Sequence, residues 1–136
     1  MNTKKFLLAG FVGGFVIAFV SLVVGKLVQL VWPYNVLELS GMRAADDPIM
    51  LLFFLHFWVL SFCLTYVYHE LKVFFPGEKT MQGKRFGLLM WVAVSVPQAF
   101  LVYSSMDYPL GFTVQSVAGS FVYMIAAGIT IVRLME

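Results

Sequence analysis

Residues 6–25 read FLLAGFVGGFVIAFVSLVVG, an apolar run that contains no charged residue. A helix rises 1.5 Å per residue, so about 20 apolar residues cross the ~30 Å hydrocarbon core of a bilayer. The stretch is therefore long enough to span a membrane as a single helix. Its apolar pattern continues past Lys26 as far as Trp32.

The whole chain shares the composition of this stretch. Of its 136 residues, 61% are hydrophobic and 12% are Asp, Glu, Lys or Arg, whereas about 25% of the residues in a typical soluble domain are charged. So few charges cannot cover a water-soluble globule, which argues against a soluble enzyme and a disordered chain. The formal net charge of +2 is too small to indicate nucleic-acid binding. The length allows one domain.

Charged residues divide the chain into four apolar windows. We therefore predict an all-α, polytopic integral membrane protein, a single domain of four transmembrane helices in an up-down bundle. The predicted spans are residues 6–32, 48–75, 86–106 and 109–132. Asp47 followed by Pro48 is typical of a helix start. Residues 35–47 are long enough to form a short amphipathic segment on the outer surface.

Most Lys and Arg residues fall on one side of this pattern. Positive residues accumulate in the cytoplasmic loops of membrane proteins, so we expect both termini in the cytoplasm. The residues on that side are Lys4, Lys5, Lys72, Lys79, Lys84, Arg85 and Arg133. The first span exceeds the apolar core of a secretory signal, and no small-residue cleavage site follows it, so we expect an uncleaved signal anchor. The cytoplasmic membrane of a prokaryote is the expected location.

Small residues mark the faces on which the helices are expected to pack. Apolar burial does not drive helix association within lipid, so close packing at small residues does much of it. The first span carries Gly10, Gly14 and Ala18, and the last carries Gly119 and Gly128. We therefore expect the first and fourth helices to be the closest pair. Docking onto another membrane subunit, or onto a second copy of the chain, is the alternative use of these residues.

The second span is aromatic on all sides. Its aromatic residues are Phe53, Phe54, Phe57, Trp58 and Phe62. Part of this surface must face the lipid bilayer or another subunit. Aromatic residues of this kind also line grooves that hold lipids, so a bound lipid is an open alternative to simple bilayer contact.

Four polar residues are expected at a similar depth in the membrane, one from each helix. When depth is counted at 1.5 Å per residue, Ser21, His56, Gln98 and Gln115 fall near one level. Polar groups inside a span carry a functional signal by default. Two interpretations stay open: hydrogen bonds that hold the helices together, or a site for a polar head group, a proton or an ion. Pro97 removes a backbone hydrogen bond beside this layer and predicts a kink.

The sequence offers little other chemistry. His56 and His69 are about 20 Å apart along one helix and differ by about 220° in direction, so they cannot bind one haem between them. We expect no cofactor and no metal site. Cys63 is the single cysteine and is expected to behave as a small buried hydrophobic residue. No catalytic motif is present, so no catalytic residue is predicted.

Three functions fit these observations. The leading hypothesis is a non-catalytic integral subunit or accessory protein that packs against a larger membrane complex. It rests on the small chain, the uncharged spans, the small-residue stripes and the aromatic second helix. The alternative is a small transporter or channel that uses the layer of His56, Gln98 and Gln115. The third is a membrane enzyme acting on a lipid or quinone, which would need His56 or Cys63 as its chemical group.

Overall fold

The computed structural model describes residues 2–136, and the regular structure within them is entirely helical. Four helices are long and apolar enough to cross a membrane: Thr3–Val31, Met50–Phe74, Lys79–Ser105 and Leu110–Met135. This confirms the predicted all-α class and the predicted number of helices. The third helix begins well before residue 86, because the charged residues that bound an apolar window do not stop a helix.

Two of the four long helices contain a π-helical segment, in which the helix accommodates one extra residue per turn. Helix α1 (Thr3–Val31) and helix α2 (Met50–Leu71) are α-helical throughout. The third long helix consists of α3 (Lys79–Met90), the π segment Trp91–Ser95 and α4 (Val96–Ser105). The fourth consists of α5 (Leu110–Val114), the π segment Gln115–Gly119 and α6 (Ser120–Met135).

Polar side chains begin the helices where the sequence suggests. Asn2 Oδ1 accepts hydrogen bonds from the backbone of Lys4 at 3.1 Å and starts α1. Asp47 Oδ1 accepts from the backbone of Ile49 at 2.9 Å just before α2, as expected of a cap residue. Glu78 caps α3, and hydrogen bonds from Thr80 hold the pKa of the Glu78 carboxyl below its usual range. This cap stabilises α3 above the usual carboxyl pKa and is lost as the pH falls through the lowered pKa.

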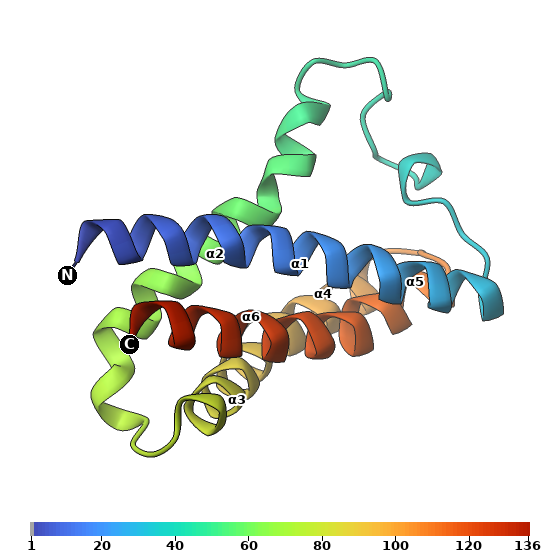
Figure 1. The fold of residues 1–136 in the computed structure, drawn as a ribbon. Coiled ribbons are helices and arrows are strands. Elements are labelled where there is room, and N and C mark those ends of the chain that lie inside the picture. The colour runs from blue at the N-terminus through green and yellow to red at the C-terminus, as the bar shows by residue number, and fades with distance from the viewer. Residues whose placement is uncertain (1) are drawn as a thin grey trace.

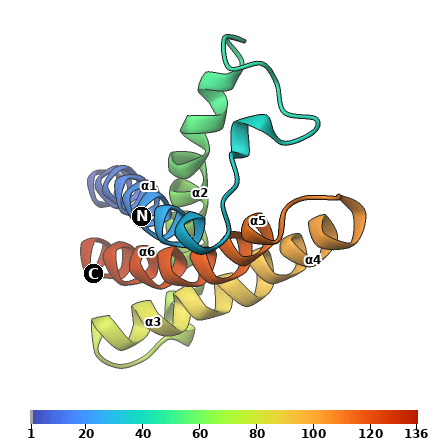
Figure 2. The same cartoon turned by 90° about the vertical axis from the view of Figure 1, so that its right-hand side faces the viewer.

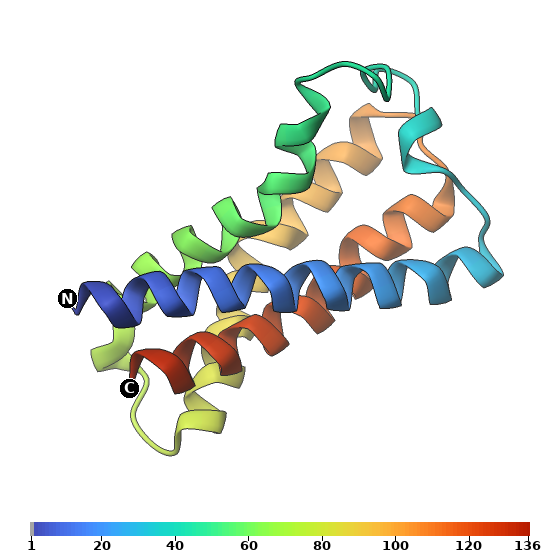
Figure 3. The same cartoon turned by 45° about the horizontal axis from the view of Figure 1, so that its top comes forward.

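The four helices pack most closely near the chain termini and diverge toward the other end. Figures 1 and 3 show α1 and α6 running side by side in opposite directions, with both chain ends at one end of the molecule. Lys5 Nζ donates to the carbonyl oxygen of Met135 at 3.3 Å there. Figure 2 shows that α3 lies against α6 on the side away from α1, and that the first half of α2 leaves the bundle.

The connection from α1 to α2 is mostly irregular. Where we expected a short amphipathic segment, its regular structure is one 3₁₀ turn, Val36–Glu38. Asn35 begins this turn by accepting a hydrogen bond from Leu37 N at 3.1 Å. The rest of the connection projects from the bundle together with the start of α2 (Figure 1).

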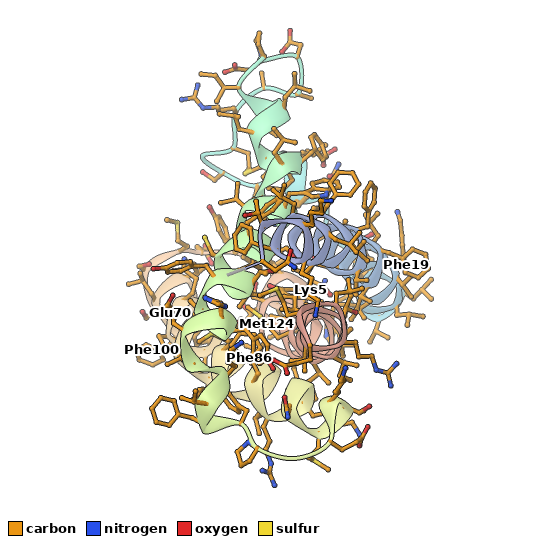
Figure 4. The ribbon with its side chains drawn as sticks, turned by 60° about the vertical axis from the view of Figure 1, so that its left-hand side comes forward. Lys5, Phe19, Glu70, Phe86, Phe100 and Met124 are labelled. Atoms are coloured by element: carbon orange, nitrogen blue, oxygen red, sulfur yellow. The ribbon has the colours of Figure 1, made fainter. Side chains whose placement is uncertain are left out.

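The buried core lies in the half of the bundle that holds the chain termini. Figure 4 shows Phe86 and Met124 between the helices, whereas Phe19 and Phe100 stand out from opposite flanks. Tyr68 is fully buried and packs edge-on against Phe86. Its hydroxyl group lies 3.0 Å from Gln82 Oε1 and 3.3 Å from Glu136 Oε1 and can donate to either oxygen. The core consists of Ile17, Leu64, Tyr68, Phe75, Phe86, Met124, Ala127, Ile131 and Val132.

Gly10 and Gly14 of α1 face α2, whereas Gly25 faces Gln115 of the fourth helix. Gly10 lies against the ring of Phe62, and Gly14 lies against the ring of Trp58, so that a methyl group on either glycine would overlap the ring. Ala18 is half-buried further along α1. We expected the first and fourth helices to be the closest pair; α1 and α6 do pack along one another, but Gly10 and Gly14 contact α2 instead, and α6 packs more extensively on α3.

Gly128 of the fourth helix makes a close backbone contact with α3, and Gly111 lies against Trp32 at the end of α1. A methyl group on Gly128 would lie 2.4 Å from the carbonyl oxygen of Gly83 and 3.0 Å from the backbone nitrogen of Gly87. Gly119 is covered by the side chain of Gln115 from its own helix. Gly83 was not predicted as a packing residue because it lies beside Lys84, outside the predicted span 86–106; Gly87 lies inside that span but belongs to no stripe of small residues there.

We predict that Gly83→Val destabilises the protein by about 1–3 kcal/mol, the usual cost of overpacking. A Cβ at residue 83 would lie 2.4 Å from the backbone Cα of Ile129, which cannot move aside as a side chain could. The measurement is equilibrium unfolding in a mild detergent followed by circular dichroism. Ala93→Val, at an exposed position of the same long helix, is the control. Equal stability of the two variants would contradict the close packing of α3 on α6.

Candidate functional site

A cleft of about 680 Å³ opens between the second half of α1, the first half of α2 and the start of the fourth helix. Ser21, His56 and Gln115, three members of the predicted polar layer, line it. Gln98 instead lines a neighbouring cavity of about 250 Å³. The two cavities share three wall residues: Phe112, Ser116 and Tyr123.

The separation of Gln98 from the other three has a physical cause. Counting residues gives the depth of a side chain but not its direction around the helix. The π segment Trp91–Ser95 lies just before Gln98 and inserts an extra residue. One extra residue rotates everything that follows by about 100°. We expected Pro97 to kink the helix. The helix instead continues through the proline, and a π segment lies just before it.

Gln115 connects the fourth helix to α1. Its Nε2 donates to the backbone carbonyl oxygen of Ser21 at 3.2 Å, so the contact uses the backbone and not the Ser21 hydroxyl. Its Oε1 is buried and has no hydrogen-bond partner among residues 2–136. A buried acceptor without a donor costs about 1–3 kcal/mol. This oxygen is therefore an unpaired acceptor of a residue that lines the cleft, and it lies beside Gly119 of the same helix.

His56 supplies a second acceptor. Its Nδ1 contacts the carbonyl oxygen of Phe53, one turn earlier in α2. Because a carbonyl oxygen only accepts, this contact fits the tautomer with the proton on Nδ1, in which Nε2 carries a lone pair. The imidazole packs on the ring of Phe57, with the centroids 3.9 Å apart. The side chain is exposed on its own helix and lines the cleft.

The mouth of the cleft, near the α1–α2 connection, carries a positive charge. Lys26 is the one formally charged side chain in the described lining, which contains no Asp or Glu. Tyr34 stands beside it and packs edge-on against Phe112, with the ring centroids 6.1 Å apart. Burial raises the pKa of the Tyr34 hydroxyl, and a hydrogen bond with the Gln29 side chain partly lowers it.

The two π segments are joined directly to each other. Trp91, the first residue of one segment, donates its indole N–H to the Val117 carbonyl oxygen of the other at 3.0 Å and lies 3.1 Å from Ser120 Oγ. Sequence reasoning missed both segments. Pro97 could have signalled the first. Nothing comparable precedes the second.

Two further buried polar atoms, Trp58 Nε1 and Ser61 Oγ, have no hydrogen-bond partner in the described chain. They face glycines of α1: a methyl group on Gly13 would lie 2.3 Å from Ser61 Oγ, and one on Gly14 would lie 2.8 Å from Trp58 Nε1. Both atoms therefore belong to the packed contact between α1 and α2. Gly13 is a packing residue that sequence reasoning also missed.

Other reactive side chains do not gather into a site. Within residues 2–136, no group of three or more His, Cys, Asp or Glu side chains is placed to hold a metal ion. Cys63 is exposed on the surface of α2, which contradicts the expectation that it is buried. The reason is that Cys63 lies on the side of α2 that no other helix of the chain covers.

We predict that Trp91→Phe destabilises the bundle by about 0.6 kcal/mol and at most about 1.7 kcal/mol, the range for hydrogen bonds between membrane helices. Phe keeps an aromatic ring but cannot donate to Val117. The measurement is unfolding in mild detergent. Trp32→Phe, at an exposed position at the end of α1, is the control and should change stability less. A stability loss no larger for Trp91→Phe than for the control would contradict the prediction.

Comparison with known proteins adds no relative. No family model matches the chain, and no curated protein or solved structure matches it either. What the protein does must therefore follow from its own residues. The features that bear on it are the cleft, the charge at its mouth and the uncovered surface of α2.

Proposed function

We propose that the four helices span a membrane with both termini on the cytoplasmic side, and that the chain is a non-catalytic integral subunit of a larger membrane complex. The observation that carries the proposal is an uncovered face of α2. We define the α2 outer face by the residues that form it: Leu52, Leu55, Val59, Cys63 and Tyr66.

The α2 outer face is a single stripe along the helix. Its residues are spaced three, four or seven apart, which places them on one side of a helix with 3.6 residues per turn. Leu52 and Val59 are 63% and 61% exposed. The cleft residues Phe53 and Phe57 lie on roughly the opposite side of the same helix, whereas His56, three residues before Val59, lies where the cleft meets the outer face. The outer face and the cleft thus adjoin at His56 and are otherwise separate surfaces.

The packing of α2 supports a partner. In lipid, helices are held together by close packing rather than by apolar burial. In the most apolar 18-residue window of the second long helix, 22% of the residues are buried inside the chain. The corresponding share for the last long helix is 39%. The first half of α2 also leaves the bundle (Figures 1 and 2). A partner helix on the outer face would supply the packing that this half of α2 lacks.

We predict that a photo-cross-linking benzoyl-phenylalanine in place of Val59 gives one defined adduct with another membrane protein in native membranes. The same group in place of Phe19, an equally exposed residue of α1, should give none. The measurement is the mass of the adducts after irradiation. Adducts from both positions, or from neither, together with migration as a lone monomer after gentle extraction, would contradict the proposal.

A small transporter or channel is the second candidate function. It is favoured by the shared wall of the two cavities, which places Gln115 and Gln98 on either side of Ser116 and its neighbours. The lack of an acid in either described lining weighs against coupling to protons or sodium.

If the chain conducts, proteoliposomes that contain it should pass ions or small polar solutes. His56→Ala and Gln115→Leu should each abolish that flux without changing assembly. Ser104→Ala, outside both cavities, should leave it unchanged. The measurement is flux of protons, potassium and small polar solutes into vesicles. A parent chain that gives no flux above protein-free vesicles would remove this candidate.

A further inference from the structure

We propose that the cleft binds a phospholipid whose headgroup carries both a phosphate anion and free hydroxyl groups. Phosphatidylglycerol is the simplest lipid of this kind. The proposal goes beyond the subunit role, because it concerns the cleft and not the α2 outer face.

The cleft has the two-sided chemistry that an amphiphile requires. Its volume of about 680 Å³ falls within the 300–1,000 Å³ typical of small-molecule sites. One part of the lining is apolar and aromatic, and the other part is polar. The apolar part consists of Leu22, Phe53, Phe54, Phe57 and Phe112. A polar solute would leave these walls uncovered, and a hydrocarbon would leave the polar groups unpaired.

Three polar side chains inside the cleft offer acceptors. Gln115 Oε1 is buried without a donor in residues 2–136, and Nε2 of His56 carries a lone pair in the tautomer described above. Ser116 Oγ donates its proton to the Phe112 carbonyl oxygen at 2.8 Å, so that its hydroxyl can only accept from a ligand. A group that donates hydrogen bonds, as hydroxyl groups do, can therefore pair with these side chains.

The mouth of the cleft, in contrast, requires a ligand group that accepts hydrogen bonds and carries a negative charge. Lys26 bears an ammonium group, which donates three hydrogen bonds and accepts none, and no acid in the described lining neutralises it. Along α1, Lys26 lies about 7.5 Å beyond Ser21, and its flexible four-carbon side chain can shorten that separation. An anion at the mouth and hydroxyl groups deeper in the cleft can therefore belong to one headgroup.

A cation at the mouth and acceptors deeper in the cleft favour some phospholipid headgroups over others. A choline headgroup has no hydrogen-bond donor for Gln115 or His56. An ethanolamine headgroup can donate, but its positive charge is repelled by Lys26. Phosphatidic acid has the phosphate but lacks the hydroxyl groups of a glycerol head. Free glycerol phosphate has both polar parts but has no chains to cover the aromatic walls.

The test uses the purified full chain in detergent with phosphatidylglycerol, phosphatidylcholine, phosphatidic acid and glycerol 3-phosphate, with dioleoyl chains on the lipids. Binding is read by native mass spectrometry and by the rise in melting temperature. We expect phosphatidylglycerol to bind at least tenfold more tightly than phosphatidylcholine, phosphatidic acid or glycerol 3-phosphate. Equal binding of phosphatidylglycerol and phosphatidylcholine would overturn the proposal. Equal binding of phosphatidic acid would overturn the hydroxyl contacts, and equal binding of glycerol 3-phosphate would show a soluble ligand instead of a lipid.

Three variants assign the preference to the cleft. Lys26→Gln should reduce the preference for phosphatidylglycerol over phosphatidylcholine by about tenfold. His56→Phe keeps the aromatic ring and should reduce the preference for phosphatidylglycerol over phosphatidic acid. Lys84→Gln removes an exposed cation from α3, outside the cleft, and should change neither preference. Unchanged preferences in Lys26→Gln and His56→Phe would place the lipid elsewhere and overturn the proposal.

The failure of this proposal can be told apart from the failure of the subunit role. Lys26→Gln should leave the cross-link from residue 59 unchanged, because Lys26 lies in the cleft and Val59 lies on the α2 outer face. Loss of lipid preference with an intact cross-link is therefore the expected pattern. A missing cross-link with intact lipid preference would reject the subunit role alone.

Discussion

The close approach of α3 and α6 at Gly83, Gly87 and Gly128 is the contact on which the rest of the bundle depends. Helices in lipid gain little from hiding apolar surface from one another, so they associate where their backbones come close enough for many weak contacts. The buried residues gather in the same half of the bundle, near the chain termini. Away from this half the helices diverge, and the cleft occupies the space that they leave. The tight end and the open end are thus two results of one packing arrangement.

Much of the fold followed from the placement of charges, but the packing did not. Charged residues bound the four apolar windows, and the structure has four long helices there. Depth counting brought Ser21, His56 and Gln115 to one cleft, but it could not foresee the π segment that turns Gln98 toward the neighbouring cavity. Gly83 was missed because it lies in the charged start of the third helix, outside the predicted span, and Gly87 because it stands alone in its span without a stripe of small residues. The side of the membrane on which the termini lie, and the signal anchor, stay predictions.

The two surfaces on α2 are related through the position of this helix. Its first half has the cleft on one side and the α2 outer face on the other, with little support from the rest of the chain. A lipid in the cleft would fill the space between α2 and the fourth helix. It would thereby limit the directions in which the start of α2 can lean, whichever headgroup it carries. In this proposal the cleft selects the headgroup, and the outer face contacts the partner.

The π segment Gln115–Gly119 sets the rotation of α6 about its own axis relative to α5. A π turn and an α turn differ by one residue, so converting one into the other turns the following helix by about 100° and shifts it by about 1.5 Å along its axis. Gln115 stands at the start of this turn, and the carbonyl that Trp91 binds lies within it. A group that binds Gln115 in the cleft would therefore contact the turn whose π or α form sets the rotation of α6. The hydrogen bond from Trp91 joins this turn to the third helix.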